Sequence, residues 1–562
     1  MELVDYILLV FFMVGITGYG LCKSREPPNI APSTQATIFG SGISVITGAL
    51  SLCSGFISSI SLLGFPAEIY YQGSMMLWYI PMYCISFPIV AYVFIPVFYN
   101  AKLITAYQYF ENRFNFSCRM ITTLLFVLQM LLYNAVALYA PSLAIASLTD
   151  IPIGVSICIT SLLSAVYISL GGAKAGIHTS AVQMLVIFVA MSAIIVISLK
   201  EIGISKAYSN VISGKRLILN DFRLNPTIRH SAWSLLIGGC GNIIALFGAN
   251  QISIQKYMAM PTLKSAQRTA MLNIICNTII LVLYVTVGLL MYAHYQACDP
   301  RLSNKNDIFS RFVMDVMPKG KGAVGLIAAA IYSAGISTLS ATFTSISSII
   351  INDVWGVIRE RHKMPALEFQ QIKNAMRVLP IFLSFVSIGL AFGCAQFKGI
   401  ILQASFIVFG AIGGPVLGSF VVGMFIPRVK GAAAVVGLLS SVMISFGVSV
   451  GATILKVRPV SLELGQCSNQ TNTVFNEGLI GTVTSTPLLY GIDRIFAVSY
   501  QYYSVIAVIT NVVVSFIVQI ILDWCSRPTD TPTRQMAPLE LTSSLLLDEQ
   551  HDPLKPREDT LA

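Results

Sequence analysis

Charged residues are scarce in this sequence: Asp, Glu, Lys and Arg together make up only 11% of its 562 residues, whereas a soluble domain carries about a quarter. A Gly-rich phosphate-binding loop and a Ser/His/Asp constellation are lacking, and the scattered cysteines and histidines have no spacing typical of zinc or haem sites. We expect no Asp or Glu within the apolar runs to support a proton relay. We therefore expect neither enzymatic activity nor a cofactor.

Hydrophobic residues make up 55% of the chain, and about thirteen apolar runs are long enough to cross a hydrocarbon core. They lie near residues 3–22, 43–70, 75–98, 121–145, 151–170, 179–199, 232–251, 269–294, 322–351, 376–395, 400–425, 431–455 and 502–524. A helix satisfies its backbone hydrogen bonds internally, and no alternating strand pattern typical of a barrel is present. The expected fold class is all-α: a polytopic membrane protein in a lipid bilayer.

The net charge of +10 does not predict nucleic-acid binding, because Lys and Arg lie between apolar runs rather than on one basic face. Residues 1–22 open with Glu2 and Asp5 rather than a basic region, so we expect a permanent span and no cleavable signal peptide. The short loops near 71–74 and 146–150 carry no Lys or Arg, whereas short segments on the other side carry several. These are Lys23, Arg25, Lys174, Arg428 and Lys430. This asymmetry predicts an extracellular N-terminus and a cytoplasmic C-terminus.

Three features lie outside the apolar runs. Asn469-Gln470-Thr471 falls in a long loop expected outside the cell, so Asn469 is a glycosylation candidate. Cys298 and Cys467 both fall in long polar loops, where a disulfide bond between them and two free thiols are alternatives. Residues 526–562 are rich in Pro, Thr, Ser and acidic residues, so we expect a disordered cytoplasmic tail after a transmembrane domain of residues 1–525.

Two apolar runs contain residues that weaken a helix. The second run has Gly55 within a cluster of serines between Leu50 and Ser61, and the seventh has the Gly-rich segment 238–242. A broken helix frees carbonyl oxygens for a cation, whereas small residues also serve close helix packing. Either segment alone favours packing. Two such segments five spans apart favour a binding site.

The ninth run carries adjacent hydroxyl residues, Ser337 and Thr338, with Ala334 one turn earlier. Two hydroxyls and one carbonyl lie close together in this arrangement, which suits a hard cation that prefers oxygen ligands. Hydroxyls in membrane helices also bond back to their own backbone. The spacing alone leaves both interpretations open.

Ordered motifs run from the first span to about residue 425. They are Leu63–Tyr70, Thr105–Phe114, Leu138–Leu143, Gly171–Ala175, Asn250-Gln251 and Gln255–Tyr257. Together they resemble the sodium/solute symporter family, in its branch of multivitamin, monocarboxylate and iodide carriers. The resemblance implies a LeuT-like core of two inverted five-helix repeats, near 43–199 and 232–425, with an interrupted helix at matching positions of each repeat.

By position, the resemblance implies two groups of site residues. A sodium ion would be bound by backbone oxygens of Ser54, Ile57 and Ala334 and by the hydroxyls of Ser337 and Thr338. The second group, for another ion or the substrate, comprises Phe56, Ser58, Ser61, Tyr133, Ser180, Gln183, Cys240 and Gly241. For Phe56 and Tyr133, core packing is an equal alternative.

One departure from the family pattern concerns the coupling ion. After the Gly-Gly run the family has Trp-Thr-Asp-x-x-Gln, whereas this sequence has His178-Thr179-Ser180 and then Gln183. A hydroxyl at Ser180 in place of the carboxylate puts a second sodium ion, or strict coupling, in doubt. The resemblance still implies a sodium-coupled transporter of a small organic anion, such as a monocarboxylate or vitamin-like acid, in the plasma membrane. A sodium-coupled sugar or polyol carrier and a transport-inactive sensor or scaffold of the same fold are the alternatives.

Overall fold

The computed structural model describes residues 1–24, 38–40, 42–149, 151–300, 302, 304–318, 322–394, 401–455, 462, 464 and 491–525. Three expectations concern residues outside this set: glycosylation of Asn469, the pairing of Cys467, and the tail 526–562. Cys298 is disulfide-bonded, whereas the nine other described cysteines are free. The pairing of Cys298 with Cys467 stays a prediction.

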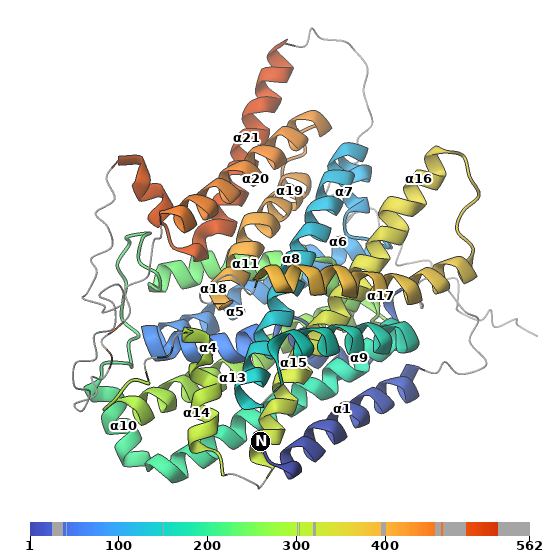
Figure 1. The fold of residues 1–562 in the computed structure, drawn as a ribbon. Helices are drawn as coiled ribbons and strands as arrows, with labels where there is room; N and C mark the ends of the chain where they lie inside the picture. The colour runs from blue at the N-terminus through green and yellow to red at the C-terminus, as the bar shows by residue number, and fades with distance from the viewer. Residues whose placement is uncertain are drawn as a thin grey trace, which may run out of the picture.

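The described part of the chain is built of helices and contains no strand (Figure 1). Its first half comprises α1 (Leu3–Ser24), α3 (Val45–Phe56), α4 (Ser59–Gln72), η1 (Ser74–Trp78), α5 (Tyr79–Ile89), η2 (Val90–Phe94), α6 (Ile95–Asn100), α7 (Gln108–Arg113), α8 (Phe116–Leu148), α9 (Ile153–Ile202) and α10 (Ile204–Ser213). Its second half comprises η3 (Ser234–Gly238), α11 (Gly239–Gly248), α12 (Gln251–Met258), α13 (Leu263–Tyr295), η4 (Lys305–Asp307), α14 (Ile308–Val316), α15 (Ala323–Ile349), η5 (Ile350–Trp355), α16 (Gly356–Arg361), α17 (Phe369–Cys394), α18 (Ile401–Val408), η6 (Phe409–Gly413), α19 (Gly414–Phe425), α20 (Gly431–Ile454), η7 (Gly491–Ala497), η8 (Tyr500–Tyr502) and α21 (Tyr503–Cys525).

The number of membrane crossings agrees with the hydropathy pattern. Among the described residues, ten helical segments are long and apolar enough to cross a membrane, and two bent helix pairs raise the number to twelve. α9 is 50 residues long and merges two helices at Gly172, where φ is 66° and ψ is −169°. Only glycine adopts this conformation without strain. When the two halves of α9 are counted separately, the crossings match the thirteen expected spans.

α15 is the most deeply buried of the crossing helices. It packs against α1, α3, α4, α8, α9 and α17. α19, α20 and α21 pack together at one edge of the bundle, drawn in orange and red in Figure 1, and α1 lies at the opposite edge. Residues in the middle of α15 are therefore shielded from lipid on all sides, which is where a polar site can be maintained.

The break expected in the second apolar run is present. α3 and α4 are bent by 66° relative to each other. Ile57 and Ser58 between them have non-helical backbone angles, and the Ser58 hydroxyl accepts a hydrogen bond of 3.2 Å from the Ile60 N–H. The serine cluster thus both weakens the helix and caps its continuation.

The break expected in the seventh run lies elsewhere. η3 and α11 continue without interruption through residues 238–242. The bend, of 51°, comes after Gly248, and the Asn250 side chain caps α12 by accepting from the Ile252 N–H at 2.9 Å. A Cβ atom at Gly238 would lie 2.5 Å from the Gln501 carbonyl oxygen. The prediction of a break at 238–242 is wrong because these glycines allow close helix packing instead.

Candidate functional site

The residues expected to bind sodium meet where the α3–α4 break faces the middle of α15. The Ser337 hydroxyl donates to the carbonyl oxygen of Ser54 at 3.1 Å and to that of Ala334 at 3.0 Å. Thr338 Oγ1 donates to the same Ala334 oxygen at 3.2 Å. All four residues are fully buried, and Ile57 ends α3 beside them. The bonds to Ala334 are those that serine and threonine hydroxyls donate to a carbonyl oxygen one turn earlier in an ordinary membrane helix. The bond to Ser54, in contrast, joins α15 to the broken helix.

Four members of the second group lie next to this cluster. The Tyr133 ring centroid is 4.6 Å from that of Phe409, and the Phe56 ring lies 6.2 Å from Phe409 and 5.0 Å from Phe247. The Tyr133 hydroxyl interacts with the side chains of Ser58 and Thr338. Ser61 Oγ donates to the Ser58 carbonyl oxygen at 2.7 Å. Aromatic packing explains the ring contacts, whereas the hydroxyl contacts connect Tyr133 to the sodium-site candidates.

Ser180 and Gln183 lie on the second half of α9, after Gly172. Gln183 lines a small cavity together with residues of α1 and with Ile336, the neighbour of Ser337 in the chain. Gln183 Oε1 is buried and has no hydrogen-bond partner. Ser180 is also buried, and α9 packs against both α3 and α15. Ser180 and Gln183 therefore belong to a helix that packs against both helices carrying the sodium-site candidates.

Thr179 does not take the place of the missing carboxylate. Its hydroxyl donates to the Ala175 carbonyl oxygen at 2.9 Å and also contacts the Tyr167 hydroxyl. A Cβ atom at Gly20 would lie 2.3 Å from Thr179 Cγ2, which places the side chain against α1. Ser180 is thus the position at which an acidic side chain would place a negative charge in this region.

We expect Ser180→Asp to lower the sodium concentration for half-maximal uptake by up to about tenfold, because a carboxylate a few ångströms from a cation favours its binding. The measurement is a sodium activation curve for uptake, normalised to the amount of protein at the cell surface. Ser180→Asn, of similar size and without charge, is the control. An unchanged curve for a well-expressed Asp variant would identify the departure at Ser180 as a neutral substitution.

Cys240 and Gly241 both belong to α11. Cys240 Sγ lies 3.9 Å from the Met82 carbonyl oxygen of α5. A Cβ atom at Gly241 would lie 2.9 Å from Val505 Cγ2 of α21. Both residues therefore contact neighbouring helices of the bundle.

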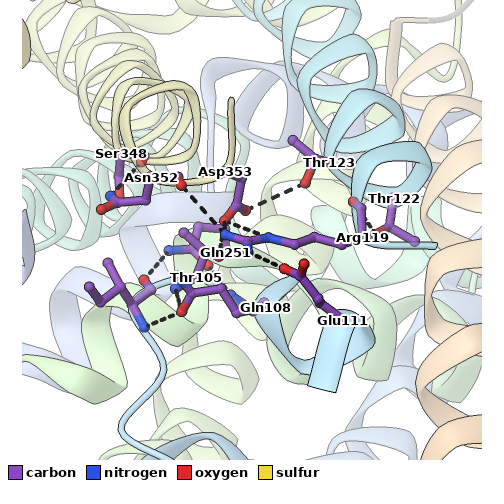
Figure 2. Close-up of polar contacts among 12 residues, drawn as sticks. Thr105, Gln108, Glu111, Arg119, Thr122, Thr123, Gln251, Ser348, Asn352 and Asp353 are labelled. Atoms are coloured by element: carbon purple, nitrogen blue, oxygen red, sulfur yellow. Dashed lines mark hydrogen bonds and ion pairs between the residues drawn. The ribbon is translucent and has the colours of Figure 1, made fainter. Parts of the chain in front are cut away.

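A buried charged network was missed by the sequence interpretation (Figure 2). Arg119 of α8 donates from Nη1 to Glu111 Oε2 at 2.5 Å and from Nε to Asp353 Oδ1 at 3.2 Å. Asp353 is fully buried in η5 and also accepts from Thr105 Oγ1 at 2.7 Å and from Thr123 Oγ1 at 3.4 Å. Asp353 lies within a crossing helix because η5 continues α15 beyond the predicted end at residue 351, and Glu68 lies inside the predicted run 43–70. That no such acid supports a proton relay stays a prediction.

Gln251 at the start of α12 extends this network (Figure 2). Its side-chain amide accepts from the Ala106 N–H at 2.8 Å and donates to the Ile104 carbonyl oxygen at 3.2 Å. The segment between α6 and α7 is thereby joined to α12 through Gln251 and to η5 through Thr105. The two repeats, each of which contains an interrupted helix, are therefore connected at this end of the bundle.

A second ion pair joins Arg229 to Glu68. It lies at the opposite end of the bundle from Arg119, because the chain crosses the bundle once between Glu68 and Arg119. Arg229 binds Glu68 with two bonds, of 2.6 and 3.1 Å, and donates to Gln403 of α18 at 3.0 Å. His230 is beside them, and burial lowers its pKa to about 4, so it is neutral at physiological pH. Glu68 lies within a predicted span, and its partner Arg229 is 161 positions away. The sequence alone therefore does not show that this acid is paired.

Comparisons with known proteins agree with this architecture. The profile of the sodium:solute symporter family matches residues 38–441. The chain is 31% identical to the sodium-dependent multivitamin transporter of Oryctolagus cuniculus, over 92% of this chain and 82% of that protein. It is 30% identical to sodium-coupled monocarboxylate transporter 1 of Mus musculus, over 92% and 86% of the two chains.

A solved structure supports the fold. The structure of a Na+-coupled sialic acid symporter superimposes with a TM-score of 0.76 at 22% identity, covering 92% of this chain and 98% of that one. The LeuT-like fold expected from the sequence is therefore confirmed. The chain belongs to the sodium:solute symporter family, whose members are membrane transporters and not enzymes.

Proposed function

We propose that this protein imports a small organic anion together with sodium, and that sodium binds to Ser54, Ile57, Ala334, Ser337 and Thr338. The observation that carries this proposal is the bond from the Ser337 hydroxyl to the Ser54 carbonyl oxygen. It brings the hydroxyl pair of α15 to the segment between α3 and α4 where the helical hydrogen bonding is interrupted. Sodium takes oxygen ligands of this kind at broken membrane helices.

The residues beside the sodium-site candidates suit a small, partly apolar solute. Phe56 and Tyr133 offer aromatic surface, and Ser58 and Ser61 offer neutral hydroxyls. A sodium ion at the break would supply the charge that attracts a carboxylate. The multivitamin and monocarboxylate transporters among the relatives support an organic acid as the solute.

The orientation follows from the short loops. We propose that the N-terminus is extracellular, that the Glu68–Arg229 pair lies toward the outside, and that the Arg119–Asp353 network lies toward the cytoplasm of a cell whose plasma membrane holds the protein. Disulfide-bonded Cys298 follows α13 at the outer end in this orientation, where oxidising conditions allow such a bond. Glycosylation of Asn469 is expected on the same side.

An uptake screen tests the proposed solute class. Membrane vesicles containing the protein are given an inward sodium gradient and radiolabelled lactate, pantothenate, biotin, glucose, inositol or iodide. We expect uptake of at least one carboxylate to rise several-fold over a choline gradient, since each sodium ion moving through about 100 mV supplies roughly 2.3 kcal/mol. Glucose or inositol uptake alone would instead assign a sugar or polyol carrier. Ligand binding without flux in a pure, correctly oriented preparation would assign a sensor.

A further inference from the structure

Lys256 of α12 is a buried basic side chain that forms no ion pair with a carboxylate in the described structure. Its side chain is 5% exposed, and its Nζ donates to the Ser51 carbonyl oxygen of α3 at 2.6 Å. None of the ion pairs among the described residues includes it. Arg119 and Arg229, which are also buried, both bind carboxylates. An ammonium group has three donors, so one carbonyl oxygen leaves most of its bonding capacity unused.

The ammonium group lies against the helix that leads to the sodium-site candidates. A Cβ atom at Gly55 would lie 2.5 Å from Lys256 Nζ, so the missing side chain of Gly55 makes room for it. The hydroxyls of Ser51 and Ser54 are both buried and have no hydrogen-bond partner. The Lys256 amine of α12 therefore lies against one turn of α3 that carries two unused hydroxyls, and the Ser54 carbonyl oxygen is part of the same turn.

Movement between α3 and α12 would change the surroundings of this charge. Transport by broken-helix carriers requires groups of helices to move relative to each other. Separation of α3 from α12 would remove the Ser51 carbonyl oxygen from Lys256 and leave the ammonium group in a space with little water. A buried charge without a partner is unfavourable. A carboxylate in that space would offset the cost, whereas a neutral solute would not.

We propose that Lys256 is a subsite for the carboxylate of the transported anion, occupied as the solute passes between α3 and α12 toward the cytoplasm. This inference rests on the proposed function. The flexible stem of lysine lets the ammonium group exchange the Ser51 carbonyl oxygen for the carboxylate. Lys256 therefore selects anions over neutral molecules of the same shape, a task that the neutral side chains of Phe56, Ser58, Ser61 and Tyr133 do not perform.

The test compares a carboxylate that the wild-type protein takes up with its neutral amide. We expect Lys256→Gln to raise the KM for the carboxylate by about tenfold or more, because a charge-assisted bond is lost, and to leave inhibition by the amide unchanged. Lys256→Arg retains most of the preference. Lys264→Gln, which removes an exposed lysine from the first turn of α13, is the control and is expected to behave as wild type. Lys256→Met keeps the apolar stem and replaces the Gln variant if that variant does not fold.

The outcomes separate the two proposals. Wild-type protein that takes up no carboxylate with sodium overturns the proposed function and the subsite together. Wild-type protein that does so, with a Gln or Met variant whose carboxylate-to-amide preference is unchanged and whose maximal rate alone is lower, overturns only the subsite. Lys256 would then hold α3 against α12 without contacting the solute.

Discussion

Uptake by Thr338→Ala is expected to need about tenfold more sodium for half-maximal rate than uptake by the wild type, and Ser337→Ala is expected to have an equal or larger effect. One oxygen ligand of the ion is lost in either variant, and losing one ligand or hydrogen bond to a charged group reduces affinity by about tenfold or more. Ser337→Ala also removes the bond that joins α15 to Ser54. The measurement is solute uptake as a function of sodium concentration.

A matched control is available on the same helix. Thr344 is buried, and its hydroxyl donates only to the Ser340 carbonyl oxygen within α15. Thr344→Ala should therefore leave the sodium dependence unchanged, and Thr338→Ser should restore most of it. Surface biotinylation separates lost sodium affinity from lost delivery. Unchanged sodium curves for both Thr338→Ala and Ser337→Ala would show that the ion binds elsewhere.

Loss of folded protein is the expected result of Arg119→Ala. Asp353 would remain fully buried with only the hydroxyls of Thr105 and Thr123 as partners. Breaking a buried ion pair by removing one partner costs about 3–5 kcal/mol, which is a large part of the stability of a typical domain. The measurement is the thermal unfolding of detergent-purified protein, together with the amount of protein at the cell surface.

Two further variants show whether the charge or the shape of Arg119 matters. Replacing both charged residues, as Arg119→Met with Asp353→Leu, should recover much of the lost stability, because a buried pair can be exchanged for apolar residues at little cost. Glu111 is 38% exposed in its side chain, so Glu111→Gln should cost less than about 1 kcal/mol. If Arg119→Ala unfolds at the wild-type temperature, the pair with Asp353 contributes nothing to stability.

Local signals in the sequence were sufficient to predict the membrane spans, the first helix break and the hydroxyl pair of α15. The apolar runs give the crossings, and clustered serines around Gly55 give the break at Ile57–Ser58. The pair Ser337 and Thr338 is recognisable because two hydroxyls stand side by side in an apolar run. Each of these features depends on residues within a few positions of one another.

The second break shows where local reasoning fails. A glycine-rich segment weakens a helix in isolation, but residues 238–242 stay helical because Gly238 packs on Gln501, far away in the sequence. The cap at Asn250 decides the position of the bend. Glycine composition alone does not separate a flexible point from a close contact between helices.

The charged residues show the same limit. Arg119 and Asp353 are 234 positions apart, and Glu68 and Arg229 are 161 positions apart. Each acid looks costly in a span until its partner is known. Lys256 lies between the predicted runs 232–251 and 269–294, whereas the bend after Gly248 brings α12 back into the bundle as a helix. The partners of the buried charged residues and the position of α12 therefore depend on tertiary contacts that the sequence pattern does not show.

Burial of the two ion pairs also determines how the protein responds to the composition of the medium. Exposed charges are screened over about 8–10 Å at physiological ionic strength, whereas buried charges are screened much less. Glu68 and Asp353 are both almost completely buried, so changes in external salinity leave the contacts at the two ends of the bundle nearly unchanged. Sodium then acts on this carrier as a specific ligand and not through bulk ionic strength. When choline replaces sodium, a change in rate is therefore expected to report occupancy of the ion site rather than weakening of these two ion pairs.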